Sequence, residues 1–197
     1  MAVDFKVLQK IKGNPSTEVA PERRLKINPG QDYVYDLPKE LIYAVNAEFP
    51  VESLFNSDKE ISADFLEERG KSFMAVLIKN TDSEAFRDRT ADMIERVAEQ
   101  TGIRFPHVFE RYVEHAILAL RPRDAWTVTE ATTKQLKVRS FNCSLGKKFA
   151  EKGISNCQTF CFAAYQAAAE KVGVPVKMTC NNDANDSGLC ELAFQKQ

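Results

Sequence analysis

The sequence predicts an α+β fold in which an antiparallel sheet of four to five strands carries helices on one face. Three observations support it: helical periodicity over residues 36–121, strand-like alternation in four short segments after Pro122, and turn residues between those segments. We expect residues 1–35 to form an extended N-terminal arm. Residues 36–197 would then be a single domain, with a helical part (36–121) followed by a β-β-α-α-β-β part (122–197).

The arm is predicted from residues that interrupt helices and strands. Residues 12–35 contain three prolines, two glycines and mixed charge, which predicts little regular structure. Val3, Phe5 and Val7 alternate weakly before it, as in an edge strand. Two interpretations of the arm stay open: a solvated tail, or a segment that binds a protein partner.

Apolar residues at helical spacing predict four helices in the first part of the domain. Two pairs, Ser57 with Glu60 and Thr81 with Glu84, have the spacing of a capping box. The predicted helices run from Asp36 to Pro50, from Glu60 to Lys79, from Ser83 to Gln100 and from Pro106 to Arg121.

After Pro122 the period changes to two. Alternation predicts a pair of strands around residues 126–129 and 136–139, and a second pair over 174–180 and 190–194. Two helices lie between the pairs, over 144–152 and 156–172, the second with Ser155 and Gln158 at capping-box spacing.

Composition narrows the class of protein. A net charge of −1 and a pI near 6.2 lack the basic footprint of a nucleic-acid-binding protein. No apolar run is long enough to span a membrane, and the first residues carry no apolar signal region. We therefore expect a cytoplasmic protein whose five cysteines are reduced.

The cysteines are the most informative residues. Cys157 and Cys161 are four apart and lie on the inward face of a predicted helix. Cys180 and Cys190 lie on the apolar faces of the last two strands, and Cys143 ends a strand just before a helix. Four or five thiols should therefore converge between helix and sheet. They could be small packed apolar groups, a reactive or ligand-lining cluster, or a thiolate metal or iron–sulfur site. No C-x-x-C pair is present, which counts against a zinc ribbon.

The two histidines, His107 and His115, lie on one predicted helix, where most histidines are surface or boundary residues. A cysteine–histidine pair could still form across the fold, and its histidine would favour the thiolate. His115 is the candidate.

Other motifs are weak or missing. Asp183, Asn185 and Ser187 fit the first half of a calcium loop, but Phe194 stands where a bidentate glutamate is required, so a polar turn explains the segment. No dinucleotide, P-loop, hydrolase-elbow or zinc-deaminase pattern is present. The sequence identifies no cofactor.

The segment from Val138 to Lys196 carries a looser pattern. It has a cysteine before a short helix, E-K-G, C-x-x-x-C on a helix, G-V-P-V-K, a polar turn, G-x-C and a strand ending in L-A-F. This pattern resembles the 4-vinyl reductase (hydrocarbon-binding) domain and the L-2-amino-thiazoline-4-carboxylic acid hydrolase-like family over about 60 residues. The turn before Cys190 is longer and richer in Asn and Asp than in those families. The matching positions are Cys143, Gly153, Cys157, Cys161, Gly188 and Cys190, with Cys180 closer to the vinyl reductase pattern.

The resemblance implies two functions. In the first, the domain binds a small apolar ligand, such as a tetrapyrrole or hydrocarbon, or assists tetrapyrrole or cofactor assembly. Its ligand would contact Cys143, Cys180, Cys190 and His115. In the second, it is a hydrolase acting on a small sulfur- or nitrogen-containing heterocycle, with Cys161 or Cys157 as nucleophile. The run of alanines over 163–169 leaves room for a ligand, and no base is evident near the thiols, so we favour binding.

Overall fold

A computed structural model of the chain describes residues 39–56, 61–85, 107–120, 124, 126–183 and 189–197. The predicted arm, nearly all of the helix predicted over 83–100, and the polar turn after Asp183 lie outside the described residues. The division into an arm and one domain therefore stays a prediction.

The described elements follow the predicted order. They are α2 (Lys39–Glu48), the 3-10 helix η2 (Val51–Leu54), α3 (Ala63–Thr81), α5 (His107–Leu120), β1 (Trp126–Ala131), β2 (Gln135–Ser140), α6 (Ser144–Glu151), α7 (Gln158–Lys171), β3 (Val176–Asp183) and β4 (Leu189–Lys196).

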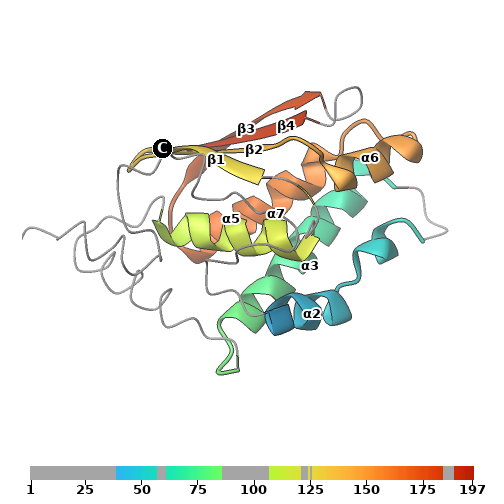
Figure 1. Ribbon diagram of the computed structural model, residues 1–197, viewed down its shortest axis with the longest axis horizontal. Helices are drawn as coiled ribbons and strands as arrows, with labels where there is room; N and C mark the ends of the chain where they lie inside the picture. Colours follow the sequence, from blue (N-terminus) through green and yellow to red (C-terminus); the bar gives the residue numbers. More distant parts are fainter. Residues whose placement is uncertain (1–38, 57–60, 86–106, 121–123, 125, 184–188) are drawn as a thin grey trace, which may run out of the picture.

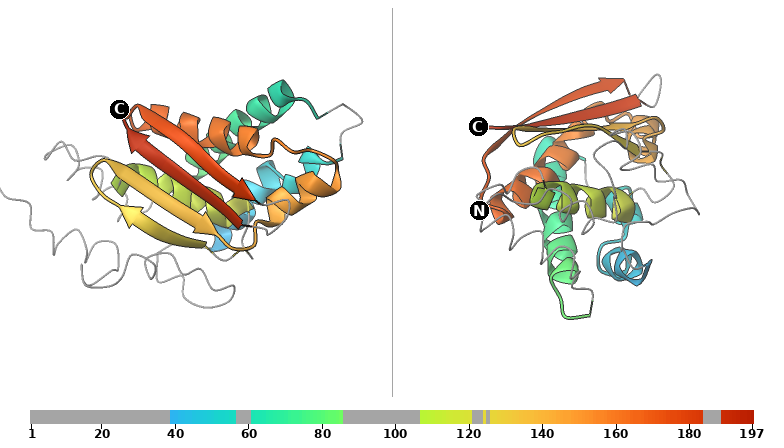
Figure 2. Two further views of the ribbon diagram at one scale, coloured as in Figure 1. Left: turned by 90° about the horizontal axis from the view of Figure 1, so that it is seen from above. Right: turned by 60° about the vertical axis from the view of Figure 1, so that its left-hand side comes forward.

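The predicted α+β architecture is confirmed. The four strands form one antiparallel sheet in the order β1-β2-β4-β3, so the last two strands pair with each other and β2 and β4 are the two inner strands. Figures 1 and 2 show the described helices on one side of this sheet, with α5 and α7 beneath it, α3 behind α7, and α2 farthest away.

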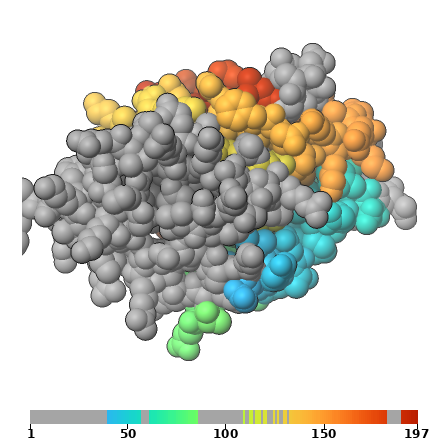
Figure 3. Space-filling model, viewed as in Figure 1, coloured from blue at the N-terminus to red at the C-terminus, as the bar shows by residue number. Residues whose placement is uncertain are grey.

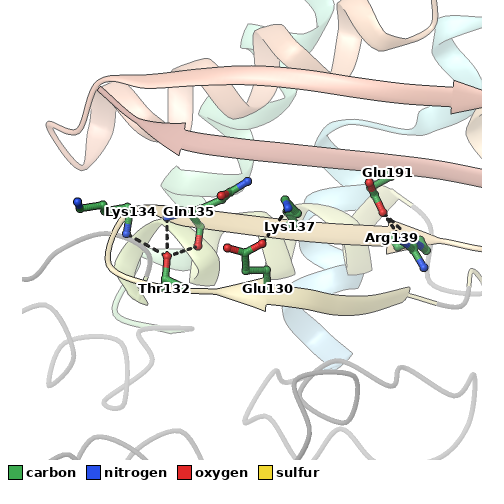
Figure 4. A network of polar contacts seen from close by, with 7 residues as sticks. All are labelled: Glu130, Thr132, Lys134, Gln135, Lys137, Arg139 and Glu191. Atoms are coloured by element: carbon green, nitrogen blue, oxygen red, sulfur yellow. Dashed lines mark hydrogen bonds and ion pairs between the residues drawn. The ribbon is translucent and has the colours of Figure 1, made fainter.

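The opposite face of the sheet is polar. On β2, Lys137 and Arg139 are partly exposed, and they alternate with fully buried residues. Lys137 pairs with Glu130 of β1 at 2.8 Å, and Arg139 pairs with Glu191 of β4 through two nitrogens. Figure 4 shows these pairs linking three neighbouring strands. The period-two alternation thus places charge outside and apolar side chains against the helices.

The core centres on Phe194 of β4, which is fully buried. Its ring meets Tyr165 of α7 edge-on at 5.3 Å and Phe109 of α5 at 5.0 Å. These aromatic contacts attach both helices to the middle of the sheet. The contact of Tyr165 with Phe194 also fixes the distance between α7 and the sheet.

A close helix crossing supports α7 from behind. Gly70 of α3 lies against the first turns of α7, where a Cβ atom would come within 2.3 Å of the Phe160 carbonyl oxygen. Only glycine lets the two backbones approach this closely. The same crossing holds the N-terminal half of α7, and with it the residues described below.

α6 packs on η2 at one end of the molecule. The rings of Phe55 and Phe149 are 4.9 Å apart, and Lys148 pairs with Glu52 at 3.2 Å. In Figure 3, α6 lies directly against the residues of η2 and of the start of α3. Among the described helices, none combines the length and the apolar character needed to cross a membrane.

The predicted capping box of Ser155 with Gln158 is wrong, and that of Ser57 with Glu60 lies outside the described residues. α3 begins at Ala63, and its N-cap is Ser62, whose hydroxyl accepts from the Phe65 N–H at 3.2 Å. α7 begins at Gln158 with Cys157 as N-cap and no side-chain cap, so Ser155 does not cap it. A capping pattern marks where a helix is able to start, and packing decides among neighbouring candidates.

Two further boundaries differ from prediction. α3 runs on to Thr81, so Thr81 belongs to its last turn and does not cap a following helix. β3 begins at Val176 because Val174 still bonds back to α7, through its N–H to the Ala169 carbonyl at 3.0 Å.

Candidate functional site

The N-terminus of α6 is capped by a thiol. Cys143 occupies the N-cap position, and its Sγ accepts a hydrogen bond from the Gly146 N–H at 3.3 Å. Cys143 is buried, so this contact is shielded from water. Backbone N–H groups at a helix N-terminus favour a negatively charged sulfur.

A buried carboxylate serves the same helix end. Asp124 is only 1 % exposed, and its Oδ2 accepts from the Ser144 N–H at 2.9 Å. Its other oxygen, Oδ1, makes no hydrogen bond to the described part of the chain. No sequence signal indicated Asp124, because it stands alone in a connection without any motif. Asp124 anchors the start of α6 and thereby holds the thiol of Cys143 in place.

The N-terminus of α7 contributes two more thiols. Cys157 is its N-cap residue, Cys161 lies one turn later, and both are buried. The predicted inward direction of this i, i+4 pair is confirmed. Gln158 lies between them, and its Oε1 is buried without a hydrogen bond to any described residue. The sequence signalled Gln158 only as a capping residue.

The last two strands supply the remaining thiols. Cys180 of β3 lies opposite Leu192, and Cys190 of β4 lies opposite Asn182, so the two cysteines are diagonal neighbours on adjacent strands. Their sulfur atoms are 3.9 Å apart. Cys190 is buried and Cys180 is half-buried. None of the five cysteines forms a disulfide.

All five cysteines line one cavity. Its wall is mostly apolar, and it is completed by Leu145, Gly146, Leu192 and one polar side chain, Gln158. Two helix N-termini and one strand hairpin therefore meet at a single sulfur-rich point. The volume open to the centre of a water molecule is about 10 Å³, which is room for about one water.

The small volume limits which ligands the cavity can enclose without a rearrangement of its wall. A tetrapyrrole or a long hydrocarbon does not fit into it as it stands. A small apolar or sulfur-seeking group can be enclosed, and a larger ligand would reach the thiols with one end or by displacing the wall.

His115 lies apart from the cavity. It is 2 % exposed within α5, and its Nδ1 is 3.2 Å from the Thr81 hydroxyl of α3. The hydrogen bond joins two helices in the core. The structure thus brings together five of the six predicted site residues and does not place His115 with them. Its predicted ligand contact stays a prediction.

The described residues contain no group of three or more His, Cys, Asp or Glu side chains placed to hold one metal ion.

Comparison with known proteins yields few matches. No family model matches the chain, and no curated protein matches it. Among solved structures, the chain is similar to the Fe(II) unliganded H-NOX protein from K. algicida, at 12% identity and a TM-score of 0.31. It is also similar to the I5F mutant of T. tengcongensis H-NOX, at 6% identity and a TM-score of 0.29. Each match covers 81% of this chain and 94% of the other. At these TM-scores the similarity carries no argument about function.

Proposed function

We propose that this chain is a small-molecule-binding domain and that its ligand contacts the five-cysteine cavity. The observation that carries the proposal is the convergence itself. Five cysteines separated by up to 47 positions, from Cys143 to Cys190, face one apolar point. Thiols that only filled space would need no common neighbour, because each could pack in its own part of the core.

The chemistry of the wall defines the ligand. The sulfur atoms and aliphatic carbons offer polarizable, apolar contacts, and the Oε1 of Gln158 is the one strong hydrogen-bond acceptor among the lining side chains. The two helix N-termini add positive potential next to Cys143 and Cys157. A ligand with an apolar or electrophilic group at its contacting end suits both features.

The finer proposal is a ligand related to tetrapyrroles or hydrocarbons, as in the 4-vinyl reductase domain that the C-terminal segment resembles. Such a ligand would place one edge among the thiols, because the cavity encloses only about one water. A role in tetrapyrrole or cofactor assembly, with the arm holding a partner protein, belongs to the same proposal. A cytoplasmic location, where thiols are kept reduced, belongs to the same proposal.

A first experiment asks whether a ligand travels with the protein. The full chain is purified without oxygen from cells that produce it, and is studied by native mass spectrometry and absorbance spectroscopy. We expect an additional bound mass, and an intense visible band if the ligand is a tetrapyrrole. The protein is also titrated with hemin as a tetrapyrrole probe and with the apolar dye ANS.

Two variants of matched size locate the binding. Cys161→Val adds one heavy atom at the cavity wall, and Val113→Ile adds one heavy atom to the core of α5 away from the cavity. We expect probe binding to be weakened at least tenfold in Cys161→Val and unchanged in Val113→Ile. Absence of a bound mass together with no binding of either probe, or equal binding by the two variants, would refute the proposal.

A second candidate is a hydrolase of the thiazoline-carboxylate type with a cysteine nucleophile. The buried position of Cys157 at the N-terminus of α7 favours it, because the helix dipole places positive potential there. Incubation with 2-aminothiazoline-4-carboxylate distinguishes the two functions. The enzyme would release product, and it would lose turnover in Cys157→Ala or in Cys161→Ala, whichever removes the nucleophile. A binding protein would leave the compound intact.

A further inference from the structure

Cys180 and Cys190 differ from the other three cavity cysteines in their geometry. Their sulfur atoms are 3.9 Å apart, within range of a weak S–H···S contact. Both lie on the inner face of the sheet and on adjacent antiparallel strands. Cys180 is half-buried and Cys190 is buried, so Cys180 is the more accessible of the two.

We propose that Cys180 and Cys190 form a reversible thiol–disulfide pair whose closure changes access to the cavity. The pair itself is independent of what the cavity binds. Its role as a regulator rests on the proposed binding function.

The reaction requires a two-electron oxidant, and a hydroperoxide is sufficient. The Cys180 thiolate attacks the outer peroxide oxygen, the O–O bond breaks, and the alkoxide or hydroxide leaves with a proton from solvent. The Cys190 sulfur then attacks the resulting sulfenic acid. An S–S bond forms, the S–O bond breaks, and water leaves. Two thiols are oxidised by two electrons and one peroxide is reduced.

The strand register makes the bond reversible. Diagonal partners on an antiparallel pair lie about 7–8 Å apart, whereas disulfides prefer Cα separations of about 4.4–6.8 Å. Closing the sulfur distance from 3.9 Å to about 2.05 Å must therefore shift the strands or strain the bond. A strained disulfide is more oxidising and is reduced readily by cellular thiols. The reduced pair is then the resting state, and oxidation is transient.

Formation of the disulfide changes the cavity because both sulfur atoms belong to its wall. The sulfurs must approach by roughly 1.9 Å, and the space admits only about one water. A displacement of this size changes whether a group can enter.

Oxidation of the full chain tests the pair. The reduced protein is treated with hydrogen peroxide or equilibrated with glutathione buffers, and the bond is assigned by intact mass and peptide mapping. We expect loss of two hydrogen atoms and a Cys180–Cys190 link in wild type and in Cys143→Ser, a cavity variant outside the pair. Cys180→Ser and Cys190→Ser should not form it. A disulfide that maps to another pair, or no disulfide in wild type, would overturn the proposal.

Regulation is measured by the rate at which iodoacetamide alkylates Cys161, which needs no bound ligand. We expect the rate in oxidised wild type to differ at least tenfold from the reduced protein, with no change in peroxide-treated Cys190→Ser. An equal rate in both states would refute the regulatory role. Failure of the binding function would show separately, as absence of hemin and ANS binding to the reduced protein.

Discussion

The crossing of α3 and α7 permits a quantitative prediction about Gly70. In an open helix, Gly→Ala stabilises by about 1 kcal/mol, because alanine loses less backbone entropy. At Gly70 the new Cβ would lie 2.3 Å from the Phe160 carbonyl oxygen and 3.0 Å from the Ala163 Cβ. The oxygen contact is about 1 Å shorter than the roughly 3.3 Å at which carbon meets a carbonyl oxygen.

The helices must separate to accommodate the methyl group, because a backbone oxygen cannot rotate away. Overpacking of this kind costs about 3 kcal/mol, so the net loss in Gly70→Ala is about 2 kcal/mol. For a chain of this size that corresponds to a fall in Tm of about 4–8 °C. Urea unfolding followed by circular dichroism measures the free energy, and a thermal scan measures Tm.

A second readout connects the crossing to the cavity. α7 carries Cys161, so moving α7 away from α3 should increase the alkylation rate of this thiol in Gly70→Ala. Gly153→Ala serves as a control, because its Cβ meets nothing within 4 Å and only its positive φ of 74° opposes substitution. A Gly70→Ala protein as stable as wild type, or more stable, would show that the close approach does not limit the packing of α7.

Three further predictions concern single measurements. Cys161→Ala removes one small buried group and should lower the free energy of unfolding, measured with urea, by an amount on the order of 1 kcal/mol. Binding of hemin and ANS should be lost. A normal affinity for both probes would exclude Cys161 from the ligand contact. Hydrogen bonds from Lys79 and then Asn80 hold the pKa of Glu48 below its ordinary value of 4.5. The stabilisation from Glu48 is therefore present above pH 4.5 and is lost as the pH falls below it. The Tm of Glu48→Gln should converge with that of the wild type in acid. A constant difference in Tm down to low pH would contradict this. Removing residues 1–35 should leave the thermal transition of the core nearly unchanged if the arm serves a partner, whereas a large fall in Tm would show that it completes the core.

The direction of the thiols was predictable because it depends on local periods. An i, i+4 pair shares one face of a helix, and residues two apart share one face of a strand. Those rules placed Cys157 and Cys161 on α7 and Cys180 and Cys190 on the hairpin, all pointing inward. The end of α7 next to Gly173 was also predictable from the local sequence, because this glycine adopts the positive φ, 68°, that follows many helix ends.

The starting points of helices were less predictable. Ser62 and Ser155 are both acceptable N-cap residues, but Ser62 caps α3 whereas Ser155 does not cap α7. The free energy of one cap is about 1 kcal/mol, which the packing of an apolar face easily exceeds. Tertiary contacts therefore choose the cap.

The α+β class, the antiparallel hairpins and the inward direction of the cysteines were predictable from the sequence, because each follows from periodicity within a few residues. The predicted convergence of four or five thiols between helix and sheet is confirmed, but only tertiary contacts bring Cys143 into the same cavity, place Asp124 at the start of α6, and keep His115 out of the cavity lining. The volume of that cavity was also beyond the sequence. It depends on how closely α7 approaches the sheet, and that distance is set by contacts between residues far apart in the chain, such as Gly70 with Phe160 and Tyr165 with Phe194.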